Sequence, residues 1–100
     1  KMLFMIIYTY EPEQRNETTK RRLHRQRVIP EGMKVIGEWS FIGGGRGFMV
    51  VDAGDPKLLL RTFSAWSDLL KFEVFPVIET EEIMKLAKSG YIDIEEAPVI

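Results

Sequence analysis

The sequence has no cysteine and a single histidine, His24. The lack of cysteine excludes disulfides, thiolate catalysis, iron–sulfur clusters and cysteine zinc sites. One histidine also excludes a multi-histidine metal centre within one chain. We therefore expect no metal and no other cofactor.

Excess charge and long apolar runs are absent too. The formal net charge is −1, so no overall field attracts nucleic acid or a membrane surface. No apolar run approaches the roughly 20 residues that span a bilayer. The apolar start of the chain runs into tyrosine and glutamate without a small-residue cleavage site, unlike a signal peptide. We expect a cytoplasmic protein with no membrane association, and the charge does not favour a nucleic-acid partner.

Apolar residues are plentiful, at 45% of the 100 residues, with 11% aromatic. A domain of this length buries only about 60–70% of its unfolded surface, yet this much apolar material suffices for a core. The surplus indicates self-association. We expect one domain over residues 1–90 and a tail over 91–100.

The residue pattern predicts seven elements. Large apolar and β-branched residues predict strands over 2–10, 33–41, 48–53 and 72–79. Capping residues and helical spacing predict helices over 13–27, within 54–72 and over 80–90. With right-handed crossovers, this order indicates an α+β, ferredoxin-like βαββαβ fold with an extra C-terminal helix and a four-stranded antiparallel sheet. Pro76 cannot donate a ladder hydrogen bond, so its strand is expected at an edge.

The strands also predict which faces are apolar. Alternation in 33–41, with Ile36 as an exception, gives one apolar face and one polar face: Met33, Val35, Trp39 and Phe41 against Lys34, Glu38 and Ser40. The other three strands are apolar on both faces, although an antiparallel sheet with one wet face should alternate. Helices cover one face. We expect the other face to be covered by a second copy, in an isologous homodimer.

The stretch "FIGGGRGFMVVDA", residues 41–53, has the strongest resemblance to a functional motif. A phosphate loop would place its glycines before a helix, but here a strand follows. "RGFMVVDA" partly matches the third strand of RNA-recognition domains, yet it lacks the stacking aromatics at Val50 and Ala53. We therefore interpret the glycines as a hairpin turn.

Few polar residues stand out as chemical groups. The 13–27 segment is basic and reads as a solvated helix face, with an anion-attracting rim as the alternative: Arg15, Lys20, Arg21, Arg22, Arg25 and Arg27. His24 lies in this run without a serine or aspartate partner at triad spacing. Glu73 lies among apolar residues and Asp52 ends a strand; either carboxylate would need a partner if buried.

Three segments carry a family resemblance: "IPEGMKVIGEW", "AGDPKLLL" and "FSAWSDLLKFEVFPVIET". The Pro–Glu–Gly turn and the Trp–Ser–Asp–Leu helix end before Phe–Glu–Val–Phe–Pro–Val are its most specific parts. The chain resembles a domain-of-unknown-function family of short bacterial proteins that look like dimeric α/β barrels built of ferredoxin-like halves. The resemblance implies this fold and dimerisation, and it carries over no catalytic residue.

Three functions remain open at this point. The first is a homodimer that binds a small apolar or aromatic molecule between sheet and helices, in a cavity lined by Tyr8, His24, Trp39, Phe48 and Trp66. The second is a cofactor-free oxygenase or isomerase in which His24 or Glu73 moves a proton. The third is an RNA-contacting or assembly module. Fold analogy does not choose among them.

Overall fold

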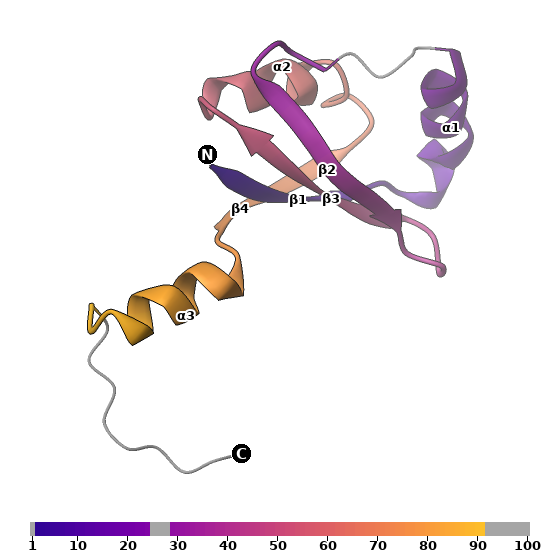
Figure 1. Ribbon diagram of the computed structural model, residues 1–100. Helices are drawn as coiled ribbons and strands as arrows, with labels where there is room; N and C mark the ends of the chain where they lie inside the picture. The colour runs from indigo at the N-terminus through magenta and orange to yellow at the C-terminus, as the bar shows by residue number, and fades with distance from the viewer. Residues whose placement is uncertain (1, 25–28, 92–100) are drawn as a thin grey trace.

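The computed structural model describes residues 2–24 and 29–91. Four strands form one sheet in the order β2-β3-β1-β4, and every neighbouring pair is antiparallel (Figure 1). The strands are β1 Leu3–Thr9, β2 Met33–Ser40, β3 Arg46–Ala53 and β4 Lys71–Val77. This is the predicted ferredoxin-like sheet, and Pro76 lies in the edge strand β4 as expected.

Four helical segments accompany the sheet: the 3-10 turn η1 Pro12–Gln14, and helices α1 Arg15–His24, α2 Lys57–Ser64 and α3 Thr80–Lys88. The Asp55 carboxylate accepts a hydrogen bond from the Lys57 amide at 2.9 Å, which satisfies a free donor of the first turn of α2. α2 ends earlier than predicted, because tight turns replace the helix after Ser64. The predicted continuation of α1 to residue 27, with Arg25 and Arg27, and the tail beyond Tyr91 lie outside the described residues.

The hydrophobic core lies between the sheet and α2. Its buried members come from β1, β3 and α2: Phe4, Ile6, Met49, Val51, Ala53 and Leu59. Burying each of the larger side chains contributes about 1.5–3 kcal/mol to the free energy of unfolding. α1, by contrast, has no buried residue. It stands beside the sheet (Figure 1).

A β-bulge divides β2 into two halves of opposite parity. Val35 pairs with Val51 of β3, whereas Gly37 pairs with Val50, so the register shifts at Ile36. The extra residue reverses which side chains point to which face. The alternation predicted for residues 33–41 is therefore correct only as far as Val35 and wrong beyond it.

The β2–β3 connection is the hairpin predicted from its glycines. Gly44 and Gly45 have φ angles of 80° and 77°, a left-handed conformation that other residues adopt only with strain. Phe41 and Arg46 close the turn through an amide-to-carbonyl bond of 2.9 Å. Since this loop joins two strands, it has no helix N-terminus with which to hold a phosphate.

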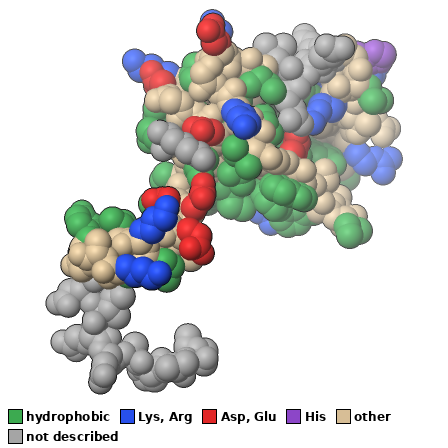
Figure 2. Space-filling model, in the orientation of Figure 1, with side chains coloured by type: hydrophobic (Ala, Val, Ile, Leu, Met, Phe, Trp, Pro, Cys, Tyr) green, Lys and Arg blue, Asp and Glu red, His purple; other side chains and the backbone are tan. Residues whose placement is uncertain are grey.

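The sheet face opposite α1 and α2 is largely apolar, with charged residues such as Asp52 and Glu73 on it, and none of the described helices covers it. Its large side chains with the most exposure are Trp39 (51%), Phe75 (45%) and Val77 (38%). Half-buried residues of β1 and β3 complete the face: Leu3, Met5, Ile7, Phe48 and Val50. Hydrophobic side chains accordingly gather on the lower side of the sheet in Figure 2. We call these eight residues the open face.

α3 does not cover either sheet face. It follows β4 and projects away from the rest of the domain (Figure 1). Met84 and Leu86 of this helix are exposed. Gly90, with φ 80°, ends the helix as predicted, and the Tyr91 amide then donates to the Leu86 carbonyl at 3.1 Å.

Candidate functional site

A pocket of about 1100 Å³ lies on the helix-covered face of the sheet, at the end next to α1, and is bordered by α1, α2 and the strands. A volume of this size falls at the upper end of the range for small-molecule sites. Apolar side chains of the sheet and of the turns after α2 form much of its wall: Met33, Val35, Met49, Trp66, Leu70 and Phe72. Leu23 of α1 and Ile29 and Pro30 before β2 add to it. Such a wall favours hydrophobic ligand atoms over water.

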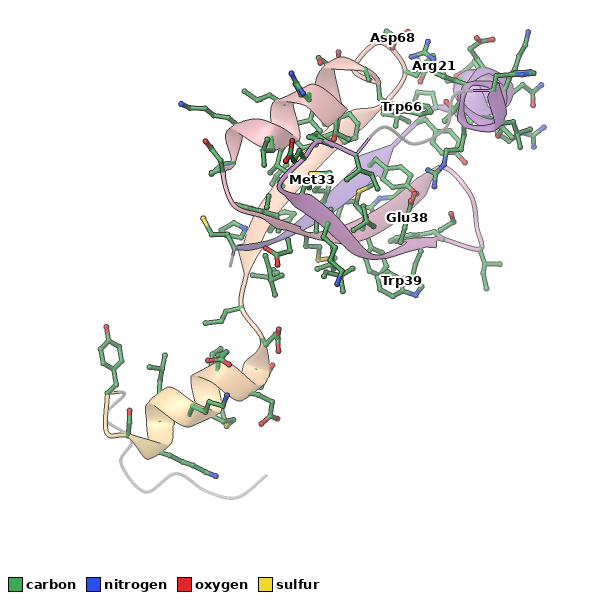
Figure 3. All side chains as sticks on the ribbon, turned by 45° about the horizontal axis from the view of Figure 1, so that its top comes forward. Arg21, Met33, Glu38, Trp39, Trp66 and Asp68 are labelled. Atoms are coloured by element: carbon green, nitrogen blue, oxygen red, sulfur yellow. The ribbon has the colours of Figure 1, made fainter. Side chains whose placement is uncertain are left out.

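The bulge in β2 directs one carboxylate into this pocket. Glu38 pairs with Met49, a residue of the covered face, so its side chain lies on the same side as the helices. Figure 3 shows Glu38 and the adjacent Trp39 pointing to opposite sides of β2. Only 12% of the Glu38 side chain is exposed. A carboxylate this buried requires hydrogen-bond partners.

Tyr8 and Arg22 supply those partners. The Tyr8 hydroxyl donates to Glu38 Oε2 at 2.6 Å. The Arg22 guanidinium donates to both carboxylate oxygens, at 3.1 Å and 2.9 Å, in a bidentate pair. Three charge-assisted hydrogen bonds thus hold Glu38 in the pocket wall. We call these residues the Tyr8–Glu38–Arg22 network.

The network shifts the titration of its members. Burial, and then the hydrogen bond to Glu38, raise the pKa of Tyr8 to about 12. The bond to Glu38 also raises the pKa of Arg22. At neutral pH the Tyr8 phenol is therefore protonated and the Arg22 guanidinium is charged.

Gly47 gives the Tyr8 ring its path to Glu38. β3 lies between β1 and β2, and Gly47 pairs with Tyr8 on one side and with Ser40 on the other. A Cβ atom at Gly47 would overlap the ring and hydroxyl of Tyr8. The tyrosine therefore crosses β3 where that strand has no side chain.

A second arginine ties α1 to the turn after α2. Arg21 makes two bonds of 2.7 Å to the Asp68 carboxylate and a third of 3.2 Å to the Ala65 carbonyl. Its guanidinium also lies 5.6 Å from the centre of the Trp66 ring, within cation–π range. The hydrogen bond to Asp68 raises the pKa of Arg21. Polar contacts by Arg21 and Arg22 thus hold α1 over the pocket.

Two threonine hydroxyls of the pocket wall are buried without a partner. Thr18 of α1 and Thr62 of α2 line the pocket, and neither Oγ1 has a hydrogen-bond partner among the described residues. A buried hydroxyl without a partner is destabilising by about 1–3 kcal/mol. Both oxygens lie beneath the pocket surface, so a ligand would reach either hydroxyl only after its side chain rotates.

The structure separates the five residues predicted to line a cavity. Tyr8 and Trp66 line the pocket. His24, the last residue of α1, is exposed and is not part of its wall. Trp39 and Phe48 face the other way and stack on each other, with ring centres 5.1 Å apart, on the open face. The sequence pattern placed Trp39 on the same face as Met33 and Val35. The bulge between Val35 and Gly37 turns it to the opposite face.

The sequence did not identify Glu38 as a pocket residue, and Arg22 was predicted on a solvated helix face. The available signal was Gly37, since a glycine inside a strand often marks a bulge. Glu73 is exposed on β4, opposite Ile7 of the open face. Asp52 pairs with Lys34 across β3 and β2. Neither carboxylate reaches the pocket.

Two kinds of site are not found in the described part of the chain. Residues 2–24 and 29–91 contain no group of three or more histidine, aspartate or glutamate side chains placed to bind a metal ion. Across the same ranges, none of the helices combines the length and the apolar character needed to cross a membrane.

Comparison with known proteins identifies a family but no characterised relative. A family model described as a domain of unknown function matches residues 2–91. None of the curated proteins matches the chain. The crystal structure of 30S ribosomal protein S6 from Thermotoga maritima is similar at 15% identity, over 88% of this chain and 99% of that one, with a TM-score of 0.38. At this level of similarity, the fold assignment rests on the strand order itself.

Proposed function

The chain belongs to the DUF3303 family, and we propose that it is a homodimer that binds a small, largely hydrophobic molecule. The observation that supports this function is the pocket of about 1100 Å³ beneath α1. An apolar wall with a few fixed polar groups is the usual composition of a small-molecule site. The family name prescribes no activity, so the proposal rests on the pocket and on the open face.

The way α1 is held supports a pocket that accepts a ligand. A helix that closed a solid core would bury apolar residues, but α1 buries none. It is attached instead through Arg21 and Arg22, whose partners lie on the α2–β4 turn and on β2. The space beneath it is bordered by apolar side chains such as Met33 and Phe72. A bound hydrophobic molecule would complete this part of the core.

Binding, rather than catalysis, is the function these residues favour. The two residues expected to move a proton, His24 and Glu73, both lie outside the pocket wall. Within the wall, Tyr8 and Glu38 are engaged with each other, and the tyrosine pKa of about 12 leaves its proton in place at neutral pH. The Tyr8–Glu38–Arg22 network therefore acts as a rigid polar wall.

The open face supports the homodimer. Four strands of seven or eight residues cover about 450 Å² when strand spacing and rise are multiplied. Two such faces in contact would bury about 900 Å², just below the roughly 1000 Å² that a biological interface should exceed. The remainder would come from adjoining surface. α3 directly follows β4 and has Met84 and Leu86 exposed, so it is the nearest apolar surface available.

A binding titration tests the pocket. The environment-sensitive dye 1-anilinonaphthalene-8-sulfonate should bind the native protein, and unlabelled dodecanoate should displace it. Met33→Trp and Phe72→Trp should each weaken both interactions at least tenfold by filling the pocket. Ile42→Trp is the matched control, because Ile42 is fully exposed at the hairpin. Equal binding by all three variants would place the dye elsewhere and refute the pocket as the binding site.

A further inference from the structure

The described part of the pocket wall has more basic than acidic side chains. Among the described residues that line it, Glu38 is the one acidic side chain. It already accepts hydrogen bonds from Tyr8 and from both terminal nitrogens of Arg22. The carboxylate is therefore fully engaged and offers little attraction to a cationic or donor-rich ligand.

The polar groups left over are donors. Arg61 of α2 lines the pocket, and no ion pair joins it to any residue within 2–24 or 29–91. The adjacent Thr62 and, across the pocket, Thr18 contribute buried hydroxyls without partners. Arg46 also reaches the wall, but its guanidinium lies 5.1 Å from the Phe41 ring centre and is occupied there.

We propose that the pocket selects an amphipathic organic anion, a carboxylate attached to a hydrophobic body; this rests on the proposed binding function. The carboxylate pairs with Arg61 at the α2 side of the pocket. The hydrophobic body lies against Met33 and Phe72. An amine would place a cation beside Arg61 with no available acid, and a neutral alcohol would forgo the ion pair.

Three probes with the same chain and different head groups test the assignment: dodecanoate, dodecan-1-ol and dodecylamine. Each is titrated calorimetrically into the full chain, below the concentration at which the probe forms micelles. Dodecanoate should bind about five- to tenfold more tightly than dodecan-1-ol, a range that reflects a charge-assisted bond at a partly exposed arginine. Dodecylamine should bind more weakly than both.

Variants locate the head group. Arg61→Gln should lower dodecanoate affinity to that of dodecan-1-ol and leave the alcohol unchanged. Lys57→Gln is the matched control, because it removes the same charge from α2 one turn away, at a residue outside the pocket wall. Thermal unfolding of each variant verifies that it is folded.

The outcomes separate the two proposals. If dodecanoate and dodecan-1-ol bind equally, the carboxylate preference is refuted while the hydrophobic pocket stands. The preference is also refuted if Lys57→Gln weakens dodecanoate as much as Arg61→Gln does, because the effect is then only net charge. If none of the three probes binds, the pocket function and the ligand class are both overturned.

Discussion

The Tyr8 hydroxyl and the Glu38 carboxylate, on strands that are not neighbours, meet in a 2.6 Å hydrogen bond across β3. Three local features make this contact possible. Gly47 leaves space for the ring, the bulge in β2 turns Glu38 toward the helices, and Arg22 neutralises the carboxylate. Each feature depends on a single residue or a short segment, so each can be altered separately.

Gly47→Ala should destabilise the protein by about 1–3 kcal/mol, because the new methyl group overlaps the Tyr8 ring and forces it to move. Urea unfolding measures the change. Gly43→Ala is the control, since a Cβ atom there has no neighbour within 4 Å. Equal stability of the two variants would show that the ring does not cross β3 at Gly47.

Tyr8→Phe should alter the stability of the protein at high pH. The pKa of Tyr8 is about 12 in the folded chain, against 10.0 for an unperturbed tyrosine. Between those values the unfolded chain loses this proton while the folded chain keeps it, so the free energy of unfolding falls as pH rises. Because the ring is half-exposed, we expect Tyr8 to account for about 1 kcal/mol of that fall.

The measurement is urea unfolding at a series of pH values from neutral to 12. Tyr8→Phe should lower the free energy of unfolding by about 1 kcal/mol at neutral pH, through loss of the hydrogen bond. Above pH 10 the free energy of unfolding of this variant should fall less steeply than that of the wild type. Tyr91→Phe, at a side chain that is 79% exposed, is the control. An alkaline slope identical in wild type and Tyr8→Phe would contradict the raised pKa.

Arg22→Gln should destabilise the protein by about 1 kcal/mol, because it leaves a carboxylate that is only 12% exposed without its cation. The estimate is low because the arginine side chain itself is 46% exposed. A double-mutant cycle of Arg22→Gln and Glu38→Gln should reveal a coupling free energy of about 0.5–1 kcal/mol between the two side chains. Arg15→Gln, at the exposed start of α1, should have little effect. Additive losses would mean that the pair contributes nothing as a pair.

Trp39→Glu should convert the proposed dimer into monomers, because it places a carboxylate on the open face beside Phe48, in the surface that the second copy would bury. Sedimentation velocity at micromolar concentration measures this. Ile42→Glu is the matched control: it makes the same kind of change at a fully exposed hairpin residue and should remain dimeric. A monomeric wild-type protein at that concentration would refute the homodimer.

The topology was accessible from the sequence because it depends on local signals. Capping at Asp55, the glycine turn at 43–45 and the apolar strands each act over a few residues, and together they predict the element order. Right-handed crossovers then leave few ways to arrange four strands. Pro76 places β4 at an edge for an equally local reason, its missing amide hydrogen.

The candidate site was only partly accessible. Tyr8 and Trp66 lie in the pocket wall, and their contact with a ligand stays a prediction. The helix predicted around His24 formed, but the histidine lies at its exposed end. Arg22 and Glu38 were visible only as charges on presumed solvent faces, because their contact joins residues 16 positions apart in the chain.

The sequence by itself determined the element order, the glycine hairpin and the two-sided apolar character of the strands, since each follows from the preferences of adjacent residues. Tertiary structure alone decided which face Glu38 and Trp39 occupy. One extra residue at Ile36 reverses the alternation of β2, and the strand accommodates that residue only through its pairing with β3. The pocket beneath α1 also depends on tertiary structure, because its size is set by how far Arg21 and Arg22 hold the helix from the sheet.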